Sequence, residues 1–154
     1  MKYHGSLISV KDINVSRKFY EELFALKVAS DFGINISFCD AFSLQQDFAK
    51  LAEFPEDSVM YKTHNFELYF EEEDLDSFIL RMKEYGNVTL LHDVREYPWG
   101  QRVIRIYDPD MHIVEIGESM ACVIKRFVGQ GLSIEETAKR TQHPVEFVKA
   151  CIGK

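Results

Sequence analysis

Cysteine is scarce in this sequence. The chain of 154 residues has three cysteines, Cys39, Cys122 and Cys151, an odd number at wide spacing. They form no Cys-x-x-Cys pair of the kind that binds zinc or exchanges electrons. The pattern is typical of thiols in a reducing compartment, so we expect a cytoplasmic protein without a disulfide framework.

Long hydrophobic runs and excess positive charge are also lacking. No apolar run approaches the ~20 residues of a membrane span, and residues 1–5 contain no apolar signal core. The formal net charge of -7 disfavours nucleic acid and anionic membranes as partners. With 46% hydrophobic and 28% charged residues, the composition indicates a soluble globular protein. The length suits one compact domain or two small modules that share a core.

A strand, a tight turn and a second strand are predicted around Asp108-Pro109-Asp110. Residues 101–107 alternate long polar and β-branched side chains, as half-buried strands do. Proline gives no backbone donor to a sheet, and aspartates suit turns. Residues 113–116 then begin a second strand, in which Glu115 is a carboxylate among apolar residues. Glu115 is therefore either exposed or salt-bridged, or a ligand or general base on the concave face of a sheet.

The order strand, helix, three strands occurs twice along the chain, on either side of a predicted linker at 47–62. The first copy has its elements at 6–10, 16–26 and, as short runs, 28–46, with Asn14 or Ser16 as the expected helix cap. The second copy has them at 65–71, 77–85, 88–92, 101–107 and 113–116. Duplicated units of this size bury a face against each other. A ferredoxin-like sandwich is the alternative, but three consecutive strands after each helix favour paired modules.

These features resemble the vicinal oxygen chelate superfamily, which includes glyoxalase I, bleomycin-resistance proteins and extradiol dioxygenases. The matching stretch is Asp-Pro-Asp-x-His followed by Ile-Val-Glu-Ile, with Met111 where that family usually has glycine. The resemblance implies an α+β fold in which two modules, at about 1–50 and 60–118, form a curved-sheet cleft. Together these modules would make one domain at 1–118, followed by a helical tail at 119–154.

The resemblance also implies a metal site. In that family each module contributes one residue from its first strand and one from its last strand to a divalent metal. The matching positions are Gln45, Glu67 and Glu115, and the fourth position falls on Gly5, which has no side-chain ligand. Oxygen ligands suit Mg²⁺ or Mn²⁺, whereas an added histidine would favour Ni²⁺ or Zn²⁺. A metal is therefore implied but not required.

Substrate-binding candidates surround this site. Tyr69 is expected to share a face with Glu67, and Trp99 and Arg102 lie on or beside the strand that leads to Asp108, as do Tyr97, Gln101 and Arg105. Trp99 offers a stacking surface, and an arginine can hold a carboxylate or phosphate. The alternative is that Trp99 packs a loop and Arg102 is solvated. His92 is a further candidate for the metal site, because it lies on the second strand of the second module.

The tail is predicted to be helical. Residues 120–128 form a helix candidate, and Ser133 with Glu136 forms a capping-box pattern. The arrangement is similar to a helix-turn-helix, and from residue 119 onward six lysines and arginines outnumber three glutamates. Helical hairpins more often cap a domain or mediate dimerisation than contact DNA, so a nucleic-acid partner is not expected.

Three functions follow from these features. The first is a metal-dependent lyase or isomerase of the glyoxalase type, in which Glu115 or Glu67 shuttles a proton. The second is a metal-free small-molecule-binding protein of the bleomycin-resistance type, which the missing ligand at Gly5 favours. The third is a ligand-responsive regulator that uses the tail. In each case we expect a small-molecule ligand, a homodimer and no membrane association.

Overall fold

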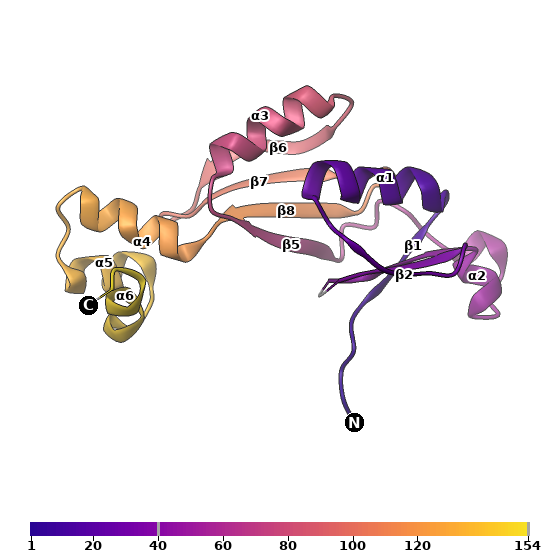
Figure 1. Cartoon of the computed structure of the whole chain (residues 1–154), viewed down its shortest axis with the longest axis horizontal. Helices are drawn as coiled ribbons and strands as arrows, with labels where there is room; N and C mark the ends of the chain where they lie inside the picture. The colour runs from indigo at the N-terminus through magenta and orange to yellow at the C-terminus, as the bar shows by residue number, and fades with distance from the viewer. Residues whose placement is uncertain (40, 154) are drawn as a thin grey trace.

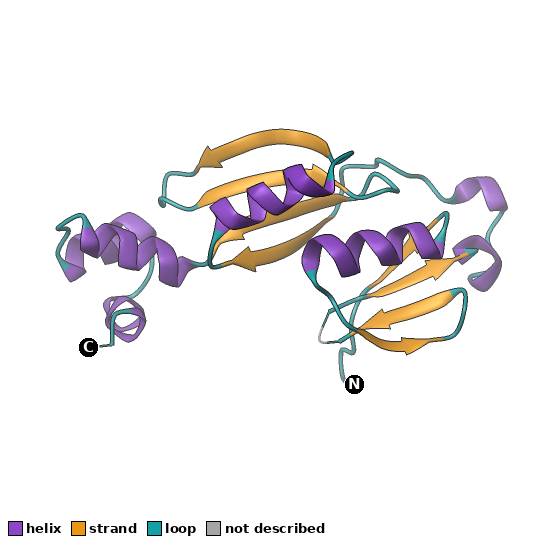
Figure 2. Cartoon of the chain, turned by 45° about the horizontal axis from the view of Figure 1, so that its top comes forward, coloured by secondary structure: helices purple, strands orange, loops and turns teal. Residues whose placement is uncertain are grey.

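The computed structural model describes residues 1–39 and 41–153. It contains two four-stranded mixed sheets, each with one helix across a face, and three further helices at the C-terminal end. Figures 1 and 2 show the second module between the first module and the tail, with α1 and α3 lying across their own sheets. The predicted α+β fold of two strand-helix-three-strand modules with a helical tail is confirmed.

The first module runs from β1 to β4. Its elements are β1 (Leu7–Val10), α1 (Ile13–Phe24), β2 (Val28–Asp31), β3 (Asn35–Phe38) and β4 (Ser43–Gln46). The strand order is β1-β4-β3-β2, with β1 and β4 parallel and the other pairs antiparallel. The helix begins earlier than predicted, because Asp12 is its cap: the carboxylate accepts from the backbone of Asn14 at 2.9 Å. The prediction of Asn14 or Ser16 as the cap is therefore wrong.

The segment between the modules is more structured than the predicted linker. It contains α2 (Phe48–Leu51) and a 3₁₀-helix, η1 (Glu56–Ser58). Pro55 immediately precedes η1, where its missing N–H group costs no helical hydrogen bond.

The second module repeats the topology of the first. Its elements are β5 (Glu67–Glu72), α3 (Leu75–Tyr85), β6 (Thr89–Glu96), β7 (Arg102–Tyr107) and β8 (Ile113–Glu118), in the order β5-β8-β7-β6. β5 is parallel to β8, and the other pairs are antiparallel. Asp74 caps α3 as Asp12 caps α1, because its carboxylate accepts from the backbone of Ser77 at 3.0 Å.

A single hydrophobic core joins the modules. Aromatic rings from both modules contact one another: Phe24 lies 4.7 Å from Phe70 and 5.6 Å from Phe78, measured between ring centroids. Phe42 of the first module also lies 6.4 Å from Phe70. These contacts, together with the buried apolar residues of both sheets, form one continuous cluster. Each module thus buries apolar surface that would face water if the other module were absent.

The Asp108-Pro109-Asp110 turn also links the modules. The buried carboxylate of Asp108 accepts a hydrogen bond from the hydroxyl of Tyr20 on α1 at 2.8 Å. Asp110 accepts from the backbone of Lys11 and from the hydroxyl of Ser16, both at 3.1 Å. Burial, followed by the charge of Asp108, raises the pKa of Tyr20 well above its ordinary value, so its hydroxyl remains a donor. The turn in the sequence motif is therefore a structural clamp on α1.

The tail forms a small helical unit with its own core. Its helices are α4 (Met120–Gly129), α5 (Ile134–Thr141) and α6 (Val145–Cys151), and they enclose Ile124, Ala138 and Val148. The predicted capping box is confirmed: Ser133 accepts from the backbone of Glu136, and the Glu136 carboxylate accepts from the backbone of Ser133. Among the described residues, no helix is long and apolar enough to span a membrane.

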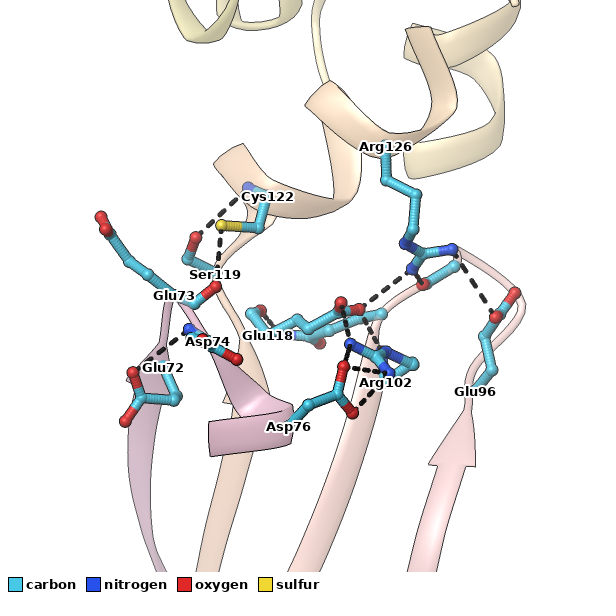
Figure 3. A network of polar contacts seen from close by, with 12 residues as sticks. Glu72, Glu73, Asp74, Asp76, Glu96, Arg102, Glu118, Ser119, Cys122 and Arg126 are labelled. Atoms are coloured by element: carbon cyan, nitrogen blue, oxygen red, sulfur yellow. Dashed lines mark hydrogen bonds and ion pairs between the residues drawn. The ribbon is translucent and has the colours of Figure 1, made fainter. Parts of the chain in front are cut away.

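An ionic network attaches the tail to the second sheet (Figure 3). The buried carboxylate of Glu118, at the end of β8, accepts from Arg102 of β7 at 2.9 Å and from Arg126 of α4 at 3.0 Å. Arg126 also donates to the carbonyl of Gly100 at 2.6 Å, and Arg102 pairs with Asp76 at the start of α3. One carboxylate thus connects the last strand, its neighbour and the first tail helix.

Candidate functional site

The face of the second sheet that α3 does not cover presents polar and aromatic side chains. Alternation along β5 sends Leu68 into the core and leaves Glu67 and Tyr69 exposed on the other side. Tyr69 lies opposite Glu115 in β8, and Glu115 lies opposite Arg105 in β7. Cross-strand partners point to the same side of a sheet. We call this side the open face and define it by Glu67, Tyr69, His92, Arg105 and Glu115.

Arg105 lies between two carboxylates on the open face. Its Nε donates to Oε2 of Glu67 at 2.9 Å, and a terminal nitrogen forms an ion pair with Glu115. The Glu115 side chain is only 11% exposed, against 39% for Glu67. A carboxylate buried to this degree is costly unless a cation pairs with it. Burial opposes the charge of Arg105, but the bonds to Glu67 and Tyr97 outweigh it, and the pKa of Arg105 lies above its ordinary value.

Two further groups accept hydrogen bonds from Arg105. One terminal nitrogen donates to the hydroxyl of Tyr97 at 2.5 Å and lies 3.3 Å from Nε2 of His92. Since a guanidinium only donates, Nε2 of His92 accepts, and the ring proton is on Nδ1. Nδ1 lies 2.7 Å from the carbonyl of Asp93, which accepts that proton. The lone pair of His92 is therefore occupied by Arg105.

Aromatic side chains extend along one edge of the open face. Tyr97 and Trp99 are stacked, with centroids 4.8 Å apart and an interplanar angle of 14°. The indole N–H of Trp99 donates to Gln101 at 3.0 Å, and Gln101 in turn donates to the hydroxyl of Tyr69 at 3.0 Å. A Cβ at Gly117 would lie 2.8 Å from Nε2 of Gln101, so glycine there makes room for this chain of contacts.

The structure brings together four of the six predicted site residues, and Arg102 and Gln45 lie apart from them. Glu67 and Glu115 meet at Arg105, and the hydrogen-bonded chain through Gln101 connects Trp99 to Tyr69. Arg102, predicted to bind substrate, is instead engaged with Asp76 and Glu118. The reason is alternation: Arg102 and Arg105 are three positions apart along β7, so their side chains point to opposite faces, and that of Arg102 points to the α3 side.

Gln45, the predicted metal ligand of the first module, lies on β4 in the other sheet. Its side chain is buried and its polar atoms are engaged: Oε1 accepts from Asn35 at 2.9 Å, and Nε2 donates to the carbonyl of Gln46 at 2.6 Å. Gly5 precedes β1 with a φ of 143°, which falls in the region that favours glycine.

Comparison with known proteins identifies the family. The family model described as a glyoxalase-like domain matches residues 3–121. The chain belongs to the glyoxalase-like family. The match ends just inside α4, so most of the helical tail lies outside the family domain. No curated protein matches the chain.

Solved structures resemble this glyoxalase-like chain over most of its length. A protein of unknown function from Agrobacterium tumefaciens str. C58 is 34% identical, with 77% of this chain and 94% of that chain covered and a TM-score of 0.67. A glyoxalase/bleomycin resistance protein/dioxygenase family enzyme from Burkholderia phytofirmans PsJN is 16% identical, with 73% and 94% covered and a TM-score of 0.64. Lactoylglutathione lyase from Agrobacterium tumefaciens is 20% identical, with 77% and 93% covered and a TM-score of 0.55. The last two show the shared fold.

The donor set of this glyoxalase-like chain does not fit a divalent metal. Within residues 1–39 and 41–153, no group of three or more histidine, cysteine, aspartate or glutamate side chains is arranged to hold one. Glu67 and Glu115 converge, but a permanently charged guanidinium stands between them. From the sequence, Arg105 is expected only beside the site. Arg105 lies directly opposite Glu115 in the β7–β8 hairpin. The correct register of this hairpin would have identified Arg105 as the partner of Glu115.

Proposed function

We propose that this protein binds a small oxygen-bearing organic molecule on the open face of the second sheet, without a metal. The observation that supports this is the stacked pair of Tyr97 and Trp99 beside the ion triad of Glu67, Arg105 and Glu115. Ligand sites commonly combine an apolar aromatic wall with a few fixed polar groups. Of the functions that the sequence predicts, this arrangement favours the metal-free binding protein.

The polar groups define what the ligand must offer. A guanidinium has five N–H donors, and the hydrogen bonds to Glu67, Tyr97 and His92 engage three of them. The other terminal nitrogen pairs with Glu115, and a donor that it does not use there suits a carbonyl or hydroxyl oxygen. Since the triad has two negative charges and one positive charge, an uncharged ligand is preferred over an anion. The aromatic pair favours a flat molecule that stacks.

A thermal-shift screen of small aromatic carbonyl compounds and oxyanions tests this proposal. We expect a neutral aromatic carbonyl compound to raise the Tm by mass action, and Trp99→Leu to reduce that shift. Phe147→Leu is the matched control, because Phe147 is an exposed aromatic residue in the tail. If no compound shifts the Tm, or if Trp99→Leu and Phe147→Leu show the same ligand-induced shift, the proposal that this face binds a ligand is wrong.

Proton transfer is a second candidate function at the same face. Glu67 is the more accessible carboxylate of the triad, with its side chain 39% exposed, so it can reach an acidic C–H group of a bound molecule. In this candidate Glu67 acts as the base, and Glu115 supports it through Arg105. Glu67→Gln should then abolish turnover of a bound carbonyl compound while retaining its binding. Turnover that survives in Glu67→Gln contradicts this role.

We also propose that the protein is a cytoplasmic homodimer. Phe32 and Ile34, on the loop between β2 and β3, are 75% and 50% exposed, and large exposed apolar side chains are typical of contact surfaces. The three cysteines are free, which suits a reducing compartment. Light scattering coupled to size exclusion tests the dimer: a single species of about 36 kDa supports it, because the chain mass is 17.9 kDa. A single species of chain mass contradicts it.

A further inference from the structure

The two carboxylates of the open face already share a positive charge that the chain itself supplies. Arg105 contacts Glu67 on one side and Glu115 on the other. These are the two positions at which the sequence predicted acidic metal ligands. An arginine guanidinium stays protonated at every pH relevant to a protein. One of the two negative charges is therefore balanced, and the two carboxylates are held apart by a cation, without an external metal ion.

The third donor of the second module is also engaged by Arg105. The histidine nearest the triad, His92, accepts from the guanidinium through Nε2. Its Nδ1 lies 2.7 Å from the carbonyl of Asp93 and bears the proton. No lone pair of His92 is then left for a metal ion while Arg105 is in place. Removal of the guanidinium would release two carboxylates and one imidazole at the same time.

As they stand, the three released side chains are not arranged to hold a metal ion, but without the guanidinium each can turn toward the space that it leaves and meet a divalent cation there. Glu67, His92 and Glu115 lie on three strands of one sheet and all reach the same guanidinium. Two carboxylates with one neutral imidazole form a ligand set that Mn²⁺, Ni²⁺ or Zn²⁺ accepts. The strands hold these residues in place independently of Arg105, because their ladders depend on backbone hydrogen bonds.

We propose that Arg105 is a built-in cation that takes the place of a metal ion between Glu67 and Glu115, and that its removal creates a divalent-metal site. The native protein is then metal-independent at the open face. This inference goes beyond the proposed binding function, because it concerns what holds the two carboxylates together. Its test does not depend on whether a small molecule binds to the open face.

Titration of metal-stripped protein with Mn²⁺, followed by calorimetry and by Tm, tests this inference. Wild type is expected to show no binding at the triad and no rise in Tm. Arg105→Gln is expected to bind Mn²⁺ at least about tenfold more tightly than wild type and to show a metal-dependent rise in Tm. Arg105→Lys is the matched control: it keeps a positive charge at this position and should behave like wild type.

The double variant Arg105→Gln with Glu115→Gln identifies the site. It should lose the metal response of Arg105→Gln, because one of the two carboxylates is gone. A folded Arg105→Gln that ignores Mn²⁺ overturns the inference, as does a response that persists in the double variant. If Arg105→Gln does not fold, Mn²⁺ binding by the wild-type protein tests the inference instead. Binding by wild type that disappears in Glu115→Gln overturns the inference. The absence of Mn²⁺ binding by wild type supports it.

Discussion

At the scale of single residues, Glu115 shows how a carboxylate is tolerated inside an apolar strand. Its neighbours Val114 and Ile116 are fully buried in the core. Its own side chain points to the open face, where Arg105 pairs with it. A salt bridge is one of the possibilities that the sequence left open for Glu115, and the structure contains it. Glu67 and Glu115 do not face each other directly, because the guanidinium lies between them.

We predict that Glu115→Gln lowers the free energy of unfolding by about 1–3 kcal/mol, because a largely buried ion pair loses its charged acceptor. Urea unfolding at neutral pH measures this. Glu67→Gln is the comparison variant and should cost about 0–1 kcal/mol, because its carboxylate is more exposed. A neutral or stabilising effect of Glu115→Gln would show that the pair with Arg105 does not contribute.

At the scale of elements, the turn between β7 and β8 determines where α1 lies. The turn is short, and its carboxylates accept hydrogen bonds from α1 and from the segment just before it. Met111 has a φ of 68°, a left-handed conformation that favours glycine. The chain thus accepts some backbone strain at Met111 while it preserves the contacts of Asp108 and Asp110. The side chains of the sequence motif therefore pack the turn against the first module and lie outside the open face.

For this turn we predict that Tyr20→Phe destabilises the protein by about 1–2 kcal/mol, because Asp108 loses a buried donor while the ring still fills its place. Thermal or urea unfolding measures the change. Tyr3→Phe is the control, since Tyr3 is 79% exposed near the N-terminus and its substitution should have little effect. Equal stability of Tyr20→Phe and wild type would contradict the clamp.

At the scale of the whole molecule, the tail is held by charge as well as by packing. Arg126 of α4 reaches both the carboxylate of Glu118 and the carbonyl of Gly100, as Figure 3 shows. Burial acts to raise the pKa of Glu118, but the hydrogen bonds from Arg102 and the charge of Arg126 outweigh it. The pKa of Glu118 therefore lies below its usual value of 4.5. The ion pairs of Glu118 with Arg102 and Arg126 require this carboxylate to be ionised.

We predict an acid-sensitive attachment of the tail. Because folding lowers the pKa of Glu118, its contribution to stability is fully present above pH 4.5 and is lost as the pH falls through the lowered pKa. Glu118→Gln should be less stable than wild type at neutral pH and should lose less stability on acidification. Limited proteolysis of the tail across this pH range, with Glu135→Gln as the control, measures the effect. An identical pH profile for wild type and Glu118→Gln would contradict it.

The sequence by itself determined the order of elements, the duplication and the family. Hydrophobic alternation, helix-capping residues and proline-containing turns act over a few neighbouring residues, so the two modules and the capping box at Ser133 could be predicted. The helix that begins at Ile13 was predicted too late because several adjacent polar residues can each act as a cap. Local patterns therefore identify elements more securely than their boundaries.

Only the tertiary structure decided which charges meet. Arg102 and Arg105 are close in sequence, yet one holds the tail through Glu118 and the other joins Glu67 to Glu115. The difference depends on the face to which each side chain points and on the register of β7 against β8. A shift of one residue in that register would exchange the two faces. The partners of a charged residue are thus a property of the assembled sheet, and the sequence alone does not specify them.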